Sequence, residues 1–248
     1  MIEKKVFKYP DANSNRAGIS DLNMKFEGQK IAIIGIGGTG SYILDLIAKT
    51  NVAEIHIYDG DVFQLHNAFR APGACAADTF PKDDSRLYKV DYFTEIYSRL
   101  RYGIVPHVLF VTEENIVDFS EYDFVFISVD SNKARFDITN ALVGLKVPFI
   151  DVGMGVNRVA NKLLGTIRVT AATAENHAHL SNRIGSDEVA ENEYTTNIQI
   201  VELNCFNATL AVIRWKKMVG FYQDLKGEYN NLFFLNTGKL LNEDITDI

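Results

Sequence analysis

The stretch Lys30-Ile-Ala-Ile-Ile-Gly35-Ile-Gly37-Gly38-Thr-Gly40 determines the fold that this sequence predicts. Its apolar, β-branched first half is typical of a short strand that is buried on both faces. The glycines end this strand, and apolar residues then recur at helical spacing from Ser41 to Thr50. A second short apolar run, Glu54–Asp59, predicts the next strand. The segment therefore predicts one strand–helix–strand unit of a parallel sheet.

The alternation of strands and helices continues along the chain. The pattern predicts a helix over 86–100, a strand over 105–110, a helix beginning at 113–118, a strand over 123–128, a helix over 134–145 and a strand over 148–151. This order predicts an α/β fold with a doubly wound, mostly parallel, Rossmann-like sheet. Beyond residue 152, a strand over 164–169, a polar loop over 175–196, a helix over 198–221 and a hairpin around 232–238 predict a mixed or antiparallel extension.

The glycine spacing G-x-G-G-x-G, after a strand and at the start of a helix, fits the dinucleotide-binding fingerprint. Gly35 is expected to form the tight turn, Gly37 to let a phosphate approach the backbone, and Gly40 to let the helix pack against the strand. The helix amides and dipole would then hold the phosphate. Asp59 ends the next strand, where its carboxylate would accept hydrogen bonds from a ribose. The alternative is a purely structural turn with Asp59 as a strand-end cap.

Composition indicates an ordinary folded protein organised around this unit. The 248 residues are 47% hydrophobic and 23% charged, and 25 Lys and Arg against 32 Asp and Glu give a net charge of −7. We expect a single domain over 1–248, with an arm over 1–28, a nucleotide-binding core over 29–155, and the sheet extension, loop and late helix over 156–248.

The negative charge disfavours nucleic acid or membrane surfaces as partners. No apolar run approaches the ~18 residues of a membrane span, and the charged start of the chain favours a cytoplasmic protein.

Polar residues downstream of the glycines favour a triphosphate with Mg²⁺ over a nicotinamide. Asn67 and Arg70 are three residues apart and would face the same way on a helical turn. Lys89 opens a predicted helix, and Asp130 directly follows a buried strand, at the sheet edge where ligands of open α/β folds bind. Cations, an amide and a carboxylate suit ATP and Mg²⁺. A hydride acceptor requires a flatter, more apolar pocket.

At these residues the sequence resembles the ThiF/MoeB family, the bacterial relatives of ubiquitin-activating enzymes. The resemblance spans roughly residues 12–170, with a weaker likeness over 198–221, and Lys89 follows an apparent insertion at 74–84. The matching motifs are Asn15-Arg16, Gly35-x-Gly37-Gly38-x-Gly40, Asp59-x-Asp61, Asn67-x-x-Arg70, Lys89 and Ser128-Val-Asp130-Ser-Asn132.

The resemblance implies ATP-dependent adenylation of a carboxylate, usually the C-terminus of a ubiquitin-like or sulfur-carrier protein, by a homodimer that uses ATP and Mg²⁺. It implies these roles: Asp59 for the ribose, Asp130 for Mg²⁺, Arg70 and Lys89 for the phosphates, Asn67 for their orientation, and Arg16 for the phosphates in the partner subunit's site. Gly35, Gly37, Gly38, Gly40, Asp61, Ser128 and Asn132 complete the implied nucleotide-binding set. The identity of the carboxylate stays open, a peptide or a modified nucleoside included.

The chain departs from the family in its cysteines. Only Cys75 and Cys205 are present, so the paired Cys-x-x-Cys zinc motifs of many members are absent, and the loop over 175–196 holds no cysteine for a thioester. We therefore expect adenylation without a thioester on this chain, with Cys205 structural and Cys75 on a loop near the nucleotide. His177 and His179 are expected in a solvated loop rather than at a metal.

Other interpretations stay open at this stage. His66 would either border the nucleotide or cap a turn, and Arg135 and Asp137 are expected to be surface charges. A non-catalytic nucleotide-binding or scaffolding subunit is disfavoured by the retained Arg70, Lys89 and Asp130. An NAD-dependent oxidoreductase is disfavoured because no proton relay is evident.

Overall fold

The computed structural model describes residues 5–80, 83, 85–185 and 198–246. Its strands are β1 (Lys30–Ile34), β2 (Glu54–Tyr58), β3 (Ile104–His107), β4 (Phe124–Ile127), β5 (Phe149–Val159), β6 (Lys162–Ala172), β7 (Glu228–Phe234) and β8 (Lys239–Ile245). Its helices are α1 (Ala12–Ala17), α2 (Gly38–Ile47), α3 (Leu65–Ala68), α4 (Lys89–Tyr97), α5 (Asn132–Leu145) and α6 (Val201–Met218), with short 3₁₀ helices η1 (Leu22–Phe26), η2 (Ile116–Glu121) and η3 (Ala178–Asn182).

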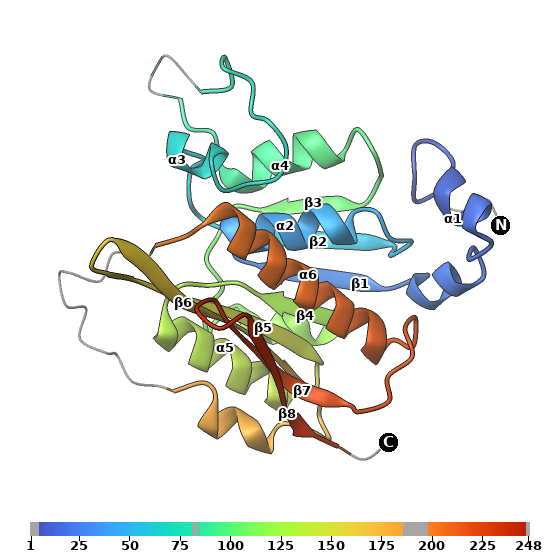
Figure 1. Cartoon of the computed structure of the whole chain (residues 1–248). Helices are drawn as coiled ribbons and strands as arrows, with labels where there is room; N and C mark the ends of the chain where they lie inside the picture. Colours follow the sequence, from blue (N-terminus) through green and yellow to red (C-terminus); the bar gives the residue numbers. More distant parts are fainter. Residues whose placement is uncertain (1–4, 81–82, 84, 186–197, 247–248) are drawn as a thin grey trace.

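The strands form one sheet in the order β3-β2-β1-β4-β5-β6-β7-β8 (Figure 1). All pairings from β3 to β5 are parallel, and all pairings from β5 to β8 are antiparallel. The sequence prediction of a doubly wound, mostly parallel sheet with an antiparallel extension is confirmed. Because β2 and β4 flank β1 on opposite sides, the strand order reverses at β1, and open sheets of this kind bind ligands at that point.

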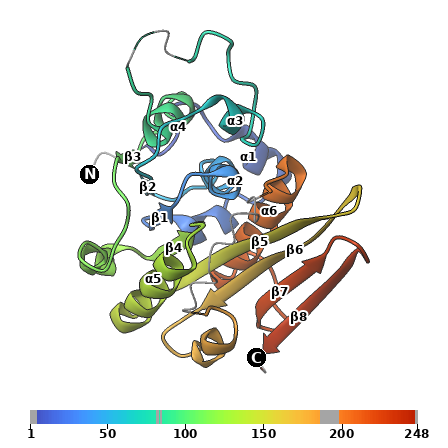
Figure 2. The same cartoon turned by 90° about the vertical axis from the view of Figure 1, so that its left-hand side faces the viewer.

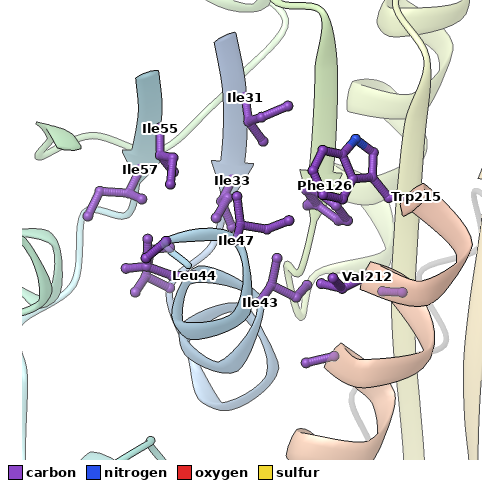
Figure 3. Packing of buried hydrophobic residues seen from close by; sticks show 14 of the residues in the cluster. Ile31, Ile33, Ile43, Leu44, Ile47, Ile55, Ile57, Phe126, Val212 and Trp215 are labelled. Atoms are coloured by element: carbon purple, nitrogen blue, oxygen red, sulfur yellow. The ribbon is translucent and has the colours of Figure 1, made fainter. Parts of the chain in front are cut away.

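Helices cover both faces of the sheet (Figure 2). On one face the buried side chains of η1, α2, α4 and α6 share a core with the strands, and on the other face α5, η2 and η3 do so. Figure 3 shows the first core, where Ile47 of α2 lies beside Ile33 of β1, Ile43 lies near Val212 of α6, and Trp215 lies beside Phe126 of β4. All of these side chains are buried. Each such aliphatic side chain contributes about 1.5–3 kcal/mol, which fixes α2, and the glycine turn before it, against the sheet.

The boundaries differ from the predicted ones where tertiary pairing decides them. The strand expected over 148–151 continues to Val159, because β6 pairs with it along its whole length. The helix expected over 86–100 is shorter, from Lys89 to Tyr97. The helix start expected at 113–118 is the 3₁₀ helix η2, and residues 186–197 of the predicted loop lie outside the described residues. In the described ranges, none of the helices has the length and apolar character that crossing a membrane requires.

Candidate functional site

A pocket of about 850 Å³ lies at the carboxyl edge of the parallel strands, where the strand order reverses. Its walls come from the ends of β1, β2 and β4, from β5 and from the start of α6. Of the residues that the sequence singled out, Gly35, Gly37, Gly38, Asp59, Asp61, Arg70, Lys89, Ser128, Asp130 and Asn132 line it. The structure therefore brings together groups that are up to 97 positions apart in the sequence.

Steric crowding explains glycine at three positions of the turn. Gly35 has φ +86°, and a Cβ there would lie 2.5 Å from the Ser128 carbonyl oxygen. A Cβ on Gly40 would lie 1.9 Å from the Gly35 carbonyl oxygen, and one on Gly38 would lie 2.1 Å from the Asn204 Nδ2. Gly37 differs, because a Cβ there would have no atom within 4 Å, so its backbone faces open space. Its role in phosphate approach stays a prediction that this geometry permits.

Two carboxylates and an ammonium form one wall of the pocket. Asp59 is buried, and its two oxygens accept hydrogen bonds from the amides of Ile36 (2.9 Å) and Asp61 (2.8 Å). These bonds fix the glycine turn to the end of β2. The buried Lys89 Nζ lies 2.6 Å from Asp61 Oδ2 and 3.4 Å from Asp59 Oδ1. The amide of Lys89 also donates to the Asp61 carbonyl, so Lys89 is held at the site although it follows the apparent insertion.

Arg70 supplies a cation that has no ion pair with any of the described residues. Its Nε is buried and has no hydrogen-bond partner among the described residues. Burial lowers the pKa of Arg70, and the nearby carboxylate of Asp130 acts in the opposite direction. Asp130 is exposed just after β4, so it can accept a ligand from solvent. An incompletely satisfied guanidinium beside an exposed carboxylate is suited to a bound phosphate and cation.

Asn67 has a structural contact that its sequence pattern did not reveal. It is buried in α3, and its Oδ1 accepts from the Gln64 amide at 2.8 Å, which caps that helix. Neither Asn67 nor Gly40 lines the pocket. Asn67 can therefore affect the site only by positioning the backbone that carries Arg70, and Gly40 only by positioning the glycine turn.

Arg135, expected to be a surface charge, instead lines the pocket and is anchored there by an ion pair. Its Nε donates to the fully buried Asp151 at 2.8 Å, and its Nη1 donates to Asn132 Oδ1 at 3.1 Å. Arg168 donates to the second oxygen of Asp151. This Arg135–Asp151–Arg168 cluster joins α5, β5 and β6. The signal in the sequence was the position of Asp151 at the end of a buried apolar run, like Asp59 and Asp130.

The first turns of α6 add two amide side chains that sequence reasoning missed. Asn204 and Asn207 are buried, line the pocket and lie three residues apart on one helix face. Asn204 Oδ1 accepts from the Thr39 hydroxyl at 3.1 Å, and Asn207 Nδ2 donates to the Gly153 carbonyl at 3.0 Å. The Asn204 Nδ2 and the Asn207 Oδ1 have no partner among the described residues. Their helical spacing was visible in the sequence, but the face they share was not.

Other singled-out residues lie outside this pocket. Arg16 is exposed on α1, and His66 is exposed on α3. Cys75 is partly buried on its loop, and Cys205 is partly buried in α6. His179, expected in a solvated loop, is half-buried and forms a 2.9 Å hydrogen bond with the Ala171 carbonyl. Burial lowers the pKa of His179.

The fold and this pocket define a doubly wound α/β protein with its ligand pocket at the topological switch point. The ThiF family model matches residues 14–193, and the chain belongs to the ThiF family, as its motifs predicted. No curated protein matches the chain at a significant level.

Solved structures share the fold over nearly the whole chain. E. coli MccB with ATP superposes with a TM-score of 0.72 at 16% identity, over 97% of this chain and 73% of that one. MccB with MccA-N7isoASN gives 0.68 at 15% identity, over 97% and 73%. PaaA gives 0.69 at 16% identity, over 100% and 79%. The chain thus has a ThiF-family adenylation fold.

Proposed function

We propose that this protein adenylates a carboxylate with ATP, and that the carboxylate is the C-terminus of a ubiquitin-like protein, a sulfur-carrier protein or a peptide. The observation that carries the proposal is Arg70, whose buried Nε has no partner within the described ranges, in a pocket that also holds the glycine turn and Asp130. The likeness to MccB, which has been solved with ATP and with MccA, supports the same class of reaction.

The pocket residues fit ATP and Mg²⁺. The open face of Gly37 leaves room for a phosphate against the backbone, and Arg70 and Lys89 supply positive charge. Among the described residues, no group of three or more His, Cys, Asp or Glu side chains forms a metal site. Mg²⁺ needs no such group, because it binds through one or two carboxylates together with phosphates and water. Asp130 is the carboxylate we assign to it, and bound Mg²⁺ would supply neutralisation of phosphate charge.

The proposed chemistry depends on positioning and charge rather than on a protein nucleophile. A carboxylate oxygen of the substrate bonds to the α-phosphorus of ATP, and the bond to pyrophosphate breaks. Arg70 and Lys89 stabilise the charge that develops on the phosphate oxygens. Asp59 accepts from the ribose, and Asp61 holds Lys89 until a phosphate replaces it. Asn67 and Gly40 keep the flanking backbone in place.

We assign Arg16 to the site of a partner subunit. Arg16 lies on α1, and the pocket of its own chain is built at the opposite ends of the strands (Figure 1). A homodimer in which α1 reaches the other protomer would complete two sites at once. Because neither cysteine lies in the pocket lining, the acyl-adenylate passes directly to an acceptor on another molecule.

Calorimetric titration of the chain with ATP plus Mg²⁺, and separately with NAD, tests the proposal. We expect ATP to bind, and Asp130→Ala to weaken binding at least tenfold in the presence of Mg²⁺, whereas Asp118→Ala, an exposed carboxylate on η2, leaves it unchanged. Binding of NAD alone would contradict adenylation and indicate an NAD-dependent oxidoreductase. If neither ligand binds, a scaffolding subunit is the better interpretation.

The carboxylate can be tested by exchange of labelled pyrophosphate into ATP. Peptides with free C-termini are compared with the same peptides carrying C-terminal amides. Exchange that depends on the free carboxylate supports adenylation of a peptide or protein C-terminus. Equal exchange with both sets would contradict it.

A further inference from the structure

A second cavity, of about 970 Å³, lies at the opposite end of the sheet from the nucleotide pocket. It is partly open to solvent and is lined by the N-terminal arm over 7–23, by the segments that follow α2 and α4, and by the last turn of α6 with the residues after it. In Figure 1 both α1 and the end of α6 lie on the right-hand side, where β1 begins. From Asn204, in the nucleotide pocket, to Lys216, in this cavity, α6 rises about 18 Å at about 1.5 Å per residue. The two cavities are therefore separate.

The walls of this cavity are held in place by the backbone. The Lys8 amide donates to the Leu100 carbonyl at 3.0 Å, and the Tyr102 amide donates to the Val6 carbonyl at 2.9 Å. Asp11 caps α1 through the Ser14 amide at 3.0 Å. The cavity is thus part of the packed structure rather than a gap beside a loose arm.

The lining is mostly apolar and aromatic. Its large apolar and aromatic side chains include Phe7, Tyr9, Leu22, Leu100, Phe221 and Tyr222. The charged residues of the lining are Asp11, Lys49 and Lys216. Asp11 accepts from the Ser14 amide and from Asn23, and Lys49 pairs with Asp45 at 2.6 Å. The Asp11 carboxylate is thus held by hydrogen bonds, and the Lys49 ammonium by an ion pair.

Lys216 is the exception. Its Nζ lies 4.6 Å from the Phe221 ring centroid, 5.4 Å from that of Phe26 and 5.9 Å from that of Tyr222. No carboxylate of the described residues forms an ion pair with it, and burial alone lowers its pKa. The neighbouring Lys217, by contrast, lies 2.5 Å from Glu228. A cation held among aromatic rings at an apolar cavity is left to be neutralised by a ligand.

We propose that this cavity binds a small amphipathic monocarboxylate, with its carboxylate on Lys216 and its apolar chain among Phe7, Leu22 and Leu100. Within the described residues, Lys216 is the charged group of the lining that has neither a hydrogen bond nor an ion pair, so it offers one contact to one carboxylate. The cavity volume is that of an ordinary small-molecule site. The argument for this binding does not rest on the adenylation proposed for the other pocket.

Trp215 provides a readout through Phe26, because it is the single tryptophan of the chain and stacks at 4.9 Å on the Phe26 ring, which lies 5.4 Å from the Lys216 Nζ. Sub-micellar octanoate should change its fluorescence saturably, and octanol, which has the same chain without the charge, should bind more weakly. Lys216→Met, which keeps the aliphatic stem, should weaken octanoate at least about tenfold and leave octanol unchanged. The exposed Lys226, outside the cavity, supplies the matched control: Lys226→Met should leave both affinities unchanged.

Absence of saturable octanoate binding would overturn the proposal, as would equal affinity in the wild-type chain and Lys216→Met. Melting curves establish that the variants are folded. A second measurement avoids the variant altogether: acetylation of Lys216 by an amine reagent, mapped by mass spectrometry on the wild-type chain, should slow in octanoate but not in octanol. Equal acetylation rates in both would contradict the carboxylate contact.

Discussion

The Lys89 ammonium lies 2.6 Å from the Asp61 carboxylate and 3.4 Å from that of Asp59, so the pocket neutralises its own lysine in the absence of ligand. Lys89 and Asp59 are buried, whereas Asp61 is 57% exposed. The stronger contact is therefore the one nearer to solvent, which is the easier of the two to give up. A phosphate that enters the pocket can take the place of Asp61 without desolvating Asp59 further.

This arrangement predicts the effect of Lys89→Met. The methionine keeps most of the buried stem but removes the charge, so ATP should bind about tenfold or more weakly in calorimetric titration. Lys30→Met provides the control. Lys30 lies outside the pocket, and its Nζ is 3.0 Å from the Glu121 carboxylate. Unchanged ATP affinity in Lys89→Met would refute the proposed contact between Lys89 and a phosphate of ATP.

Arg16→Ala tests the assignment of α1 to a partner's site. Because Arg16 lies outside the pocket of its own chain, its loss should lower pyrophosphate exchange while ATP affinity stays close to that of the wild type. Arg99→Ala is the matched control, since Arg99 is an exposed arginine paired with Glu95 on α4. An unchanged exchange rate in Arg16→Ala would refute the role in the partner's site.

Much of the fold could be predicted from local sequence, because buried strands and helix-spaced runs alternate clearly from Lys30 to Asp151. The candidate site was predictable where a side chain directly follows a strand, as for Asp59 and Asp130. Residues whose placement depends on long-range packing could not be predicted from the sequence. Arg135 reads as a surface charge on its own helix, and only the pairing of β5 with β4 and β6 places Asp151 beneath it.

The pH dependence of stability should reflect a pair of histidines on adjacent strands. His56 Nδ1 lies 3.0 Å from His107 Nε2, and in this contact one ring donates and the other accepts. Burial, and then His56, lower the pKa of His107 below its ordinary value of 6.5. The unfolded chain therefore takes up a proton that the folded chain resists, and stability should fall as the pH drops below about 6.5.

Thermal melts between pH 7.5 and pH 5 measure this effect. His107→Gln should reduce the fall in melting temperature over that range, whereas His177→Gln, at an exposed position, should leave it unchanged. An equally steep fall in His107→Gln would assign the acid sensitivity to other groups, such as His179, whose pKa burial also lowers.

Asp151 should be the carboxylate whose loss destabilises the fold most. It is fully buried, and Arg135 and Arg168 bond to its two oxygens from α5 and β6. Asp151→Asn keeps the volume but leaves two guanidinium groups facing each other without a counter-charge. Removing one member of a buried ionic cluster costs about 3–5 kcal/mol. At about 2–4 °C per kcal/mol for a chain of this size, the melting temperature should fall by at least roughly 6 °C.

Glu95→Gln, in an exposed pair, should change stability by no more than about 0.5 kcal/mol. If both variants melt alike, the cluster is not what joins the parallel and antiparallel parts of the sheet beneath the pocket.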